Sequence, residues 1–195
     1  MTNYNADFLS PNELARLPLA ACGESVLIDR TSHIIGVENL SLGSHVRIDA
    51  NTIIVASGPV RIGSFVHVAA NCYLEGRAGI ELADFCNLSS YVSLHSVSDD
   101  FSGRSLTNPM TPEALKTLVT GAIVLERHVA VGAKSTLLPG VQVGEGGVVG
   151  AHSLVRENVL AWQIVAGVPA RPIRERARDL LALEARMFEQ PGGAR

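Results

Sequence analysis

The chain has 195 residues, with 16 Lys and Arg against 19 Asp and Glu for a net charge of -3, and only nine aromatic residues. This balance disfavours a nucleic-acid partner, which needs a basic face, and no apolar run reaches the ~20 residues that cross a bilayer. Its three cysteines form no CxxC pair and the N-terminus lacks a secretory pattern, so we expect a cytoplasmic protein without a membrane span.

Residues 1–33 are predicted to form an N-terminal cap. Ser10-Pro11-Asn12-Glu13 has the capping-box pattern with proline at the first helical position, which predicts a short helix over 11–17. Such a cap suits a following segment whose strand edges would otherwise stay unpaired.

From Leu40 onward, aliphatic residues recur every six positions, a period that fits neither an α-helix nor an alternating hairpin strand. Three hexads make one triangular turn, and a step of 20 from Leu42 to Ile62 implies a two-residue bulge at one corner. The pattern predicts an all-β fold, a parallel β-helix over 34–170 whose strands stack ~4.8 Å apart. The fifteen positions are Leu42, Ile48, Ile54, Ile62, Val68, Leu74, Leu82, Leu88, Leu94, Leu125, Val131, Leu137, Val143, Val149 and Val155.

The hexads are interrupted once, between Leu94 and Ile123, by the segment 96–122. Loops longer than ~12–15 residues in a compact domain are usually functional or disordered, and we interpret this excursion as a functional loop. After the last hexads, residues 171–195 are predicted to form a helix and tail. The helix is expected from Pro172 to Phe188, with Glu184 inside its apolar stripe and its last turn therefore loosely packed.

The hexads, together with Val165-Ala166-Gly167-Val168-Pro169-Ala170-Arg171-Pro172-Ile173, resemble the left-handed β-helix acyltransferases of the hexapeptide-repeat family. The sequence is most similar to the maltose/galactoside-type and surface-polysaccharide sugar O-acetyltransferases, over roughly residues 34–175. The resemblance implies an acetyl-CoA-dependent O-acetyltransferase acting on a sugar or nucleotide-sugar hydroxyl. It also implies a homotrimer with sites between neighbouring prisms, and no metal.

Acetyl transfer to a hydroxyl needs a general base, and a histidine suits that role near neutral pH. His95 follows the last aliphatic position before the loop, with Asp99 and Asp100 near enough in sequence to orient its ring. The resemblance places the catalytic histidine of maltose-type enzymes at Asp99, which makes Asp99 the second candidate. His95 ranks first because a carboxylate needs a raised pKa to deprotonate an alcohol. Acceptor contacts are expected from the loop residues Ser98, Phe101 and Asn108.

In the resembling enzymes the pantetheine arm of the donor runs along the later coils and contacts small residues. Flat residues allow a thin chain to approach closely, and arginines near the tail suit the phosphates of CoA. The positions that match are Gly132, Ala133, Ser135, Gly150, Ala151, Arg171 and Arg174.

Three alternatives stay open. One is N-acetylation of an amino sugar, and another is a metal-dependent γ-carbonic-anhydrase-like enzyme on the same fold, although the closely spaced histidine pair of such enzymes is absent. The third is a binding solenoid without catalysis, which needs neither the loop nor the tail motif. His67 projects outward in a column with Arg47 and Asn87, where a surface or interface role is favoured over chemistry.

Overall fold

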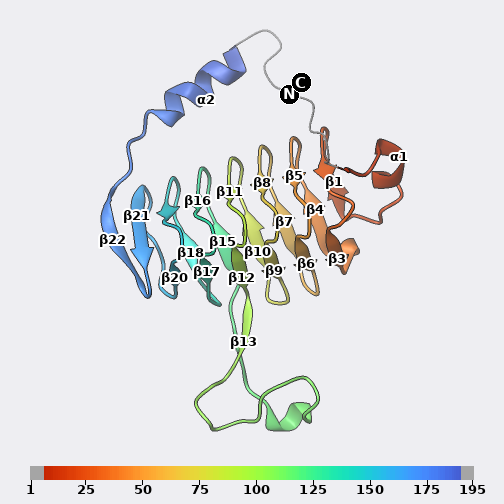
Figure 1. Cartoon of the computed structure of the whole chain (residues 1–195), viewed down its shortest axis with the longest axis vertical. Coiled ribbons are helices and arrows are strands. Elements are labelled where there is room, and N and C mark those ends of the chain that lie inside the picture. Colours follow the sequence, from red (N-terminus) through yellow and green to blue (C-terminus); the bar gives the residue numbers. More distant parts are fainter. Residues whose placement is uncertain (1–6, 190–195) are drawn as a thin grey trace.

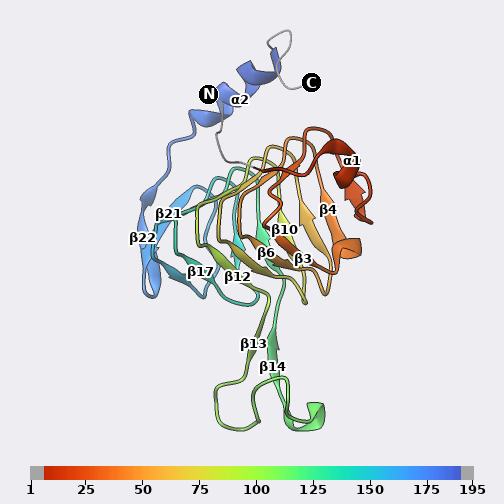
Figure 2. The same ribbon diagram turned by 45° about the vertical axis from the view of Figure 1, so that its right-hand side comes forward.

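The computed structural model describes residues 7–189 and forms the predicted left-handed parallel β-helix (Figure 1). Each coil contributes one short strand to each of three sheets, which are the faces of a triangular prism (Figure 2). Face 1 consists of β1 (Ala21–Cys22), β4 (Leu40–Leu42), β7 (Val60–Ile62), β10 (Ile80–Leu82), β15 (Ile123–Leu125) and β18 (Gln142–Val143).

The other two faces repeat this arrangement. Face 2 consists of β2 (Leu27–Ile28), β5 (Arg47–Ile48), β8 (His67–Val68), β11 (Asn87–Leu88), β16 (Ala130–Val131), β19 (Val148–Val149), β21 (Gln163–Gly167) and β22 (Ala170–Glu175). Face 3 consists of β3 (His33–Ile35), β6 (Ile53–Val55), β9 (Tyr73–Glu75), β12 (Ser93–His95), β17 (Thr136–Leu137) and β20 (Leu154–Val155).

The fifteen aliphatic residues of the hexad series fill the interior, and none exposes more than 3% of its surface. The strands pair in register, so that Val68, Leu88 and Val131 lie directly over one another in face 2. Burying such side chains contributes ~1.5–3 kcal/mol each, which makes these columns the main source of stability.

The coils begin at β1, thirteen residues before the predicted boundary at 34. Cys22 pairs with Leu42, and β2 and β3 pair with β5 and β6 in the same way. The thiol of Cys22 stands where the later coils have an aliphatic residue, so this coil lacks the first member of the hexad series. A search for six-residue steps therefore misses this first coil. The cap that remains contains α1 (Pro11–Leu14), which has the predicted capping box and ends three residues earlier than expected.

Aromatic rings stack on the outside of the prism, along the corner between faces 1 and 2. His45, Phe65, Phe85 and His128 occupy equivalent corner positions with φ between 57° and 62°. Successive ring centroids are 4.7, 4.9 and 4.9 Å apart. The interior admits only small side chains, so the larger rings gather at this corner, which we call the aromatic corner.

The segment that interrupts the hexads forms an arm, residues 97–120, that projects away from the prism (Figures 1 and 2). Its stem is an antiparallel pair of β13 (Val97–Asp99) and β14 (Leu118–Thr120), and η2 (Glu113–Leu115) lies near its tip. The short η1 (Val37–Asn39) lies in the first coils.

The C-terminal segment differs from the predicted helix over nearly its first half, up to the start of α2 at Leu180. The chain turns at Val168-Pro169, and β22 pairs antiparallel with β21, covering the last edge of face 2. An unpaired edge costs backbone hydrogen bonds, which explains why the strand prevails over the helical pattern. The helix α2 covers only Leu180–Glu189.

Residues 176–189 form a strap along the aromatic corner. Arg176 donates to the carbonyl of His128 at 2.7 Å, and Glu184 bonds the Nε2 atom of His128 at 2.7 Å and the guanidinium of Arg127. Phe188 packs edge-on against Phe65 and Phe85. Glu184, predicted to loosen the last turn, therefore anchors α2.

Trp162 packs at the last coil, as predicted, and is 6% exposed. The Arg178 guanidinium lies 5.2 Å from the centre of its ring. Within residues 7–189, none of the helices is long and apolar enough to cross a membrane.

Candidate active site

The outward side chains of face 2 divide it into two parts along the prism axis. The early coils carry a polar cluster, and the later coils carry a small-residue strip. The polar cluster consists of Arg47, Asp49, His67, Asn87 and Ser89, with the small Ala69 among them. The small-residue strip consists of Ala130, Gly132, Gly150 and Ala166, and the aliphatic Val148 and Ile164 stand beside it on the same later strands.

Asp49 is the centre of the polar cluster. It accepts a hydrogen bond from Arg47 Nε at 2.6 Å and contacts His67 Nε2 at 2.8 Å, while His67 Nδ1 lies 3.1 Å from Asn87 Oδ1. Burial raises the pKa of Asp49, but the hydrogen bonds from His67 and Arg47 outweigh it and hold that pKa below its ordinary value. The carboxylate is therefore ionised at neutral pH.

The glycines of the strip are required by coil stacking. A Cβ at Gly132 would lie 2.5 Å from the backbone nitrogen of Ala151, and one at Gly150 would lie 2.7 Å from the Ala166 Cβ. The same absence of side chains leaves a flat surface outside. Ala133 and Ala151 border the strip at the corner towards face 3.

Ser135 is fully buried, contrary to its predicted contact with the donor. Its hydroxyl donates to the carbonyl of Gly150 at 2.9 Å and accepts from the amide of Ser153 at 3.1 Å. A side chain committed to joining two coils has no surface to offer a ligand.

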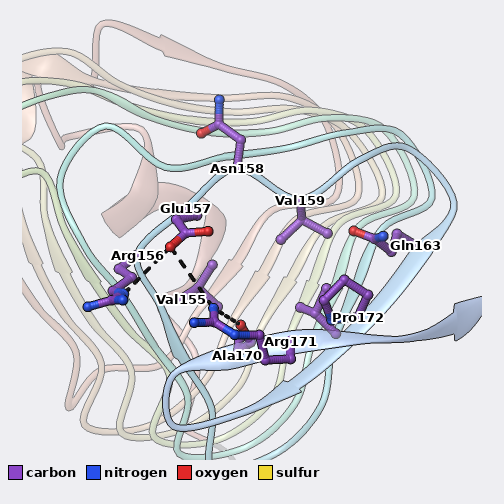
Figure 3. Close-up of a pocket in the computed structure, with 10 residues that line it drawn as sticks. Val155, Arg156, Glu157, Asn158, Val159, Gln163, Ala170, Arg171 and Pro172 are labelled. Atoms are coloured by element: carbon purple, nitrogen blue, oxygen red, sulfur yellow. Dashed lines mark hydrogen bonds and ion pairs between the residues drawn. The ribbon is translucent and has the colours of Figure 1, made fainter.

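The predicted arginines lie on β22, which completes face 2 beyond the strip. Arg171 is exposed and stands 4.0 Å from Glu157 across a cavity of about 210 Å³ at the end of the prism (Figure 3). Arg174 donates to the carbonyl of Glu175, on the same strand. Both arginines thus lie on the last strand of face 2.

His95 points outward from face 3, close to the point where the arm leaves the prism. Its ring centroid lies 5.5 Å from that of Tyr73, and its strand partner is Glu75. Burial lowers the pKa of His95, and the nearby Glu75 carboxylate opposes that shift only in part. The imidazole is thus neutral and able to accept a proton at neutral pH.

Neither predicted aspartate hydrogen-bonds the His95 ring within residues 7–189. Asp100 instead accepts from the amide and hydroxyl of Ser102, at 2.9 and 2.7 Å, which folds the arm locally. Hydrogen bonds to the ionised form lower the pKa of Asp100. Glu75 is the carboxylate that faces His95, and it also accepts from the Ser96 hydroxyl at 3.2 Å.

The predicted acceptor residues are spread along the arm. Ser98 lies in β13, Phe101 follows that strand and is 82% exposed, and Asn108 shapes a turn by accepting from the Met110 amide at 2.9 Å. The arm carries them away from their own prism, so in a single chain they do not meet the strip of face 2 (Figure 1).

A metal site finds no support in this geometry. The described part of the chain contains no group of three or more His, Cys, Asp or Glu side chains that could hold a metal ion. His67 and His95 lie on different faces.

A scan of the sequence against models of known protein families found no match. The chain is 33% identical over 179 residues to a dTDP-4-amino-4,6-dideoxy-D-glucose acyltransferase of Escherichia coli, covering 91% of this chain and 93% of that protein. It is 39% identical to the N-acyltransferase AntD of Bacillus cereus, solved in complex with dTDP and 3-hydroxybutyryl-CoA. That match covers 95% of this chain and 98% of AntD, with a TM-score of 0.91.

A hexapeptide-repeat acetyltransferase of Vibrio cholerae shares the fold at 21% identity, with a TM-score of 0.55 over 84% of this chain and 78% of that one. A β-helix of hexads with a flat strip on one face and an inserted arm is thus the framework of an acyltransferase. The chain belongs to the hexapeptide-repeat acyltransferase family, as the sequence motifs indicated.

Proposed function

We propose that the protein transfers the acyl group of an acyl-CoA, such as acetyl-CoA, to the amino group of a nucleotide-linked amino sugar. The observation that carries the proposal is the similarity, over nearly the whole chain, to an amino-sugar acyltransferase and to AntD. It favours the N-acylation alternative over transfer to a hydroxyl, and acyl transfer over the metal-dependent alternative.

The donor is proposed to lie along the small-residue strip of face 2. Four strand spacings separate β22 from β11, which is ~19 Å at ~4.8 Å each. A pantetheine arm stretched over this length would join phosphates near Arg171 and Arg174 to a thioester near Asn87 and Ser89. The change from small to polar side chains at β11 supports this orientation, because the extended arm needs a flat path and the reacting groups need polar partners.

The acceptor is proposed to meet the thioester at the polar end of the strip. Its neutral amine attacks the thioester carbonyl carbon, the C–N bond forms, and the C–S bond breaks with its electrons leaving on sulfur. The proton lost by nitrogen passes to a base and then to the CoA thiolate. His95 stays our first candidate for that base because it is neutral, and Asp99 stays the second.

The site is proposed to be shared between copies of the chain in a homotrimer. Solved variants of AntD alter one serine and one aspartate ten positions further along. Ser89 and Asp99 have that spacing here, as do Ser90 and Asp100. Ser89 follows a strand of face 2, whereas Asp99 lies on an arm that leaves from face 3. A neighbouring copy would supply the arm that completes each site.

The enzyme assay mixes the purified protein with acetyl-CoA or 3-hydroxybutyryl-CoA and a dTDP-linked amino sugar, and follows CoA release with a thiol reagent. The matching dTDP-linked sugar with a hydroxyl in place of the amine is the second acceptor. Turnover confined to the hydroxyl sugar would refute N-acylation, and no turnover with either would refute the proposed function.

The donor path is tested by Ala130→Leu, which puts a bulky side chain on the strip without touching the core. Val124→Leu is the control, since Val124 points outward on face 1 of the same coil. We expect Ala130→Leu to raise KM for acyl-CoA at least tenfold and Val124→Leu to leave it unchanged. Equal KM values would contradict the placement of the donor.

The base is assigned by comparing His95→Ala with Asp99→Ala. General-base catalysis contributes ~10²–10⁴-fold, so loss of the base should lower kcat by that factor. Full activity in His95→Ala would remove it from the mechanism. If Ser89→Ala and Asp99→Ala are each inactive, mixing them should restore part of the activity, because the proposed site takes these two residues from different copies.

A further inference from the structure

His95 and Glu75 lie next to each other on face 3, close to the point where the arm leaves the prism. β12 and β9 pair in parallel, and their last residues, His95 and Glu75, are direct partners in the register. Partner residues on neighbouring strands are ~4.8 Å apart and point to the same side of the sheet. The imidazole and the carboxylate are therefore side by side on the outer surface.

The carboxylate of Glu75 is held in place by the corner that follows β9. Its Oε1 atom accepts from the Arg77 amide at 3.1 Å, and its Oε2 atom accepts from the Ser96 hydroxyl at 3.2 Å. Ser96 is fully buried, and its hydroxyl in turn accepts from the Ala78 amide at 2.9 Å. Both donors to Glu75 are uncharged, and within residues 7–189 Glu75 forms no ion pair. Its negative charge is thus fixed in position and not neutralised by a cation.

The ionisable groups around the His95 ring come from three elements. β9 contributes Tyr73, with ring centroids 5.5 Å apart, and Glu75, while Arg77 is exposed at the corner beyond them. The stem of the arm contains Asp99, which pairs with the opposite strand of the stem, and β17 on the other side of β12 contains no ionisable residue. Burial lowers the pKa of His95, and among these groups it is Glu75 that opposes the shift.

We propose that Glu75 is a positioning residue for acyl transfer, which holds a fixed negative charge beside His95 and stabilises the imidazolium formed when this ring accepts the proton of the acceptor amine. This role rests on the proposed function with His95 as the base. The amine nitrogen loses its proton to a ring nitrogen of His95 as the new C–N bond forms, and the proton then passes to the sulfur of the departing CoA thiolate. A charge placed in advance where the opposite charge develops lowers the barrier of such a step.

The first test is a titration of the histidine rings of the full chain by NMR. The His95 signal is assigned by its absence in His95→Ala. We expect the pKa of His95 to fall by about 1 in Glu75→Gln, at the lower end of the effect of an opposite charge ~4–6 Å away, because both side chains are partly exposed. Glu81→Gln is the matched control, since Glu81 is an exposed carboxylate pointing outward from face 1, and it should leave the pKa of His95 unchanged.

The second test asks whether the pair acts in the reaction. A base loses activity as the pH falls through its pKa, so the acidic limb of the kcat profile should move to lower pH by about 1 in Glu75→Gln. At neutral pH the weaker base should lower kcat ~3–10-fold, with KM for both substrates unchanged. A merely structural role would not move the acidic limb.

The variant Glu75→Asp separates charge from structure. It keeps the charge on a shorter side chain, whereas Glu75→Gln keeps the length and an acceptor oxygen for the corner. The proposal therefore expects Glu75→Asp to be the more active of the two, and the reverse order would contradict it.

An unchanged pKa of His95 in Glu75→Gln would overturn the proposal, as would an unchanged acidic limb. Full activity of His95→Ala would overturn it too, while leaving acyl transfer itself in place. If the pKa of His95 falls as predicted but the native chain transfers no acyl group to either acceptor, the charge pair stands and the proposed function fails.

Discussion

The strap offers a prediction that separates local from global stability. Glu184 is 11% exposed at its side chain and joins α2 to both Arg127 and His128. A helix of ten residues is marginal on its own, so the order of α2 depends on this contact and on Phe188. Replacing Glu184 by Ala removes two charge-assisted hydrogen bonds and leaves His128 buried without its partner.

The cost follows from those two bonds. Hydrogen bonds to charged groups contribute ~1.5–3 kcal/mol, and the exposure of Arg127 reduces its share, so we expect Glu184→Ala to lower the free energy of strap detachment by about 2 kcal/mol. That value corresponds to ~30-fold faster amide exchange in α2. Repeat coils contact only their neighbours, so exchange of the central coil amides should not change.

Hydrogen exchange followed by mass spectrometry measures both regions in one experiment. Glu189→Ala, an exposed carboxylate on the same helix, is the control and should leave exchange in α2 nearly unchanged. Equal effects of the two substitutions, or unchanged exchange in α2 of Glu184→Ala, would refute the anchoring role of Glu184.

Three further predictions follow from burial and charge. The pKa of Asp49 is lowered in the folded state, so the stability that its carboxylate contributes is complete above the unfolded pKa and is lost on acidification. Urea denaturation should therefore show that the difference in unfolding free energy between the native chain and Asp49→Asn shrinks from pH 6 to pH 3. Leu88→Ala, at a fully buried position, should cost about 2–5 kcal/mol in the same assay without lowering the secondary-structure content of the folded state. Burial raises the pKa of Cys72 to about 11 and that of Cys86 to about 12, so a thiol reagent should modify only the exposed Cys22 in the native protein, and all three cysteines in urea.

The β-helix was predictable because one physical constraint repeats in every coil. Each coil must place an aliphatic side chain in the interior at each face, and this requirement is visible in one sequence as a six-residue period. The prediction failed where a local residue broke the signal, as Cys22 does in the first coil, or where a helical pattern competed with an unpaired edge, as in β22. The aromatic corner is also readable, since Phe65 and Phe85 are 20 residues apart, but the six-residue count ignores corner positions.

The site was less predictable because function lies on outward columns, where side chains are not fixed by packing. The column of Arg47, His67 and Asn87 was visible in the sequence, yet its support by Asp49 was not, because Asp49 belongs to the neighbouring outward column. His95 was singled out by its place before the loop, and the structure shows that Glu75, twenty residues earlier, is the carboxylate beside it. Sequence neighbours such as Asp99 and Asp100 are carried off by the arm instead.

The same geometry explains how one scaffold could separate donor and acceptor. Along face 2 the coils with Gly132 and Gly150 must be flat because adjacent backbones approach too closely for a Cβ. The coils with Arg47 and His67 carry long polar side chains on this face instead. A flat path for a thin chain therefore ends where polar side chains begin, at Asn87 and Ser89. If acyl transfer occurs there, acceptor specificity depends on the early coils and the arm, and donor specificity depends on the later coils.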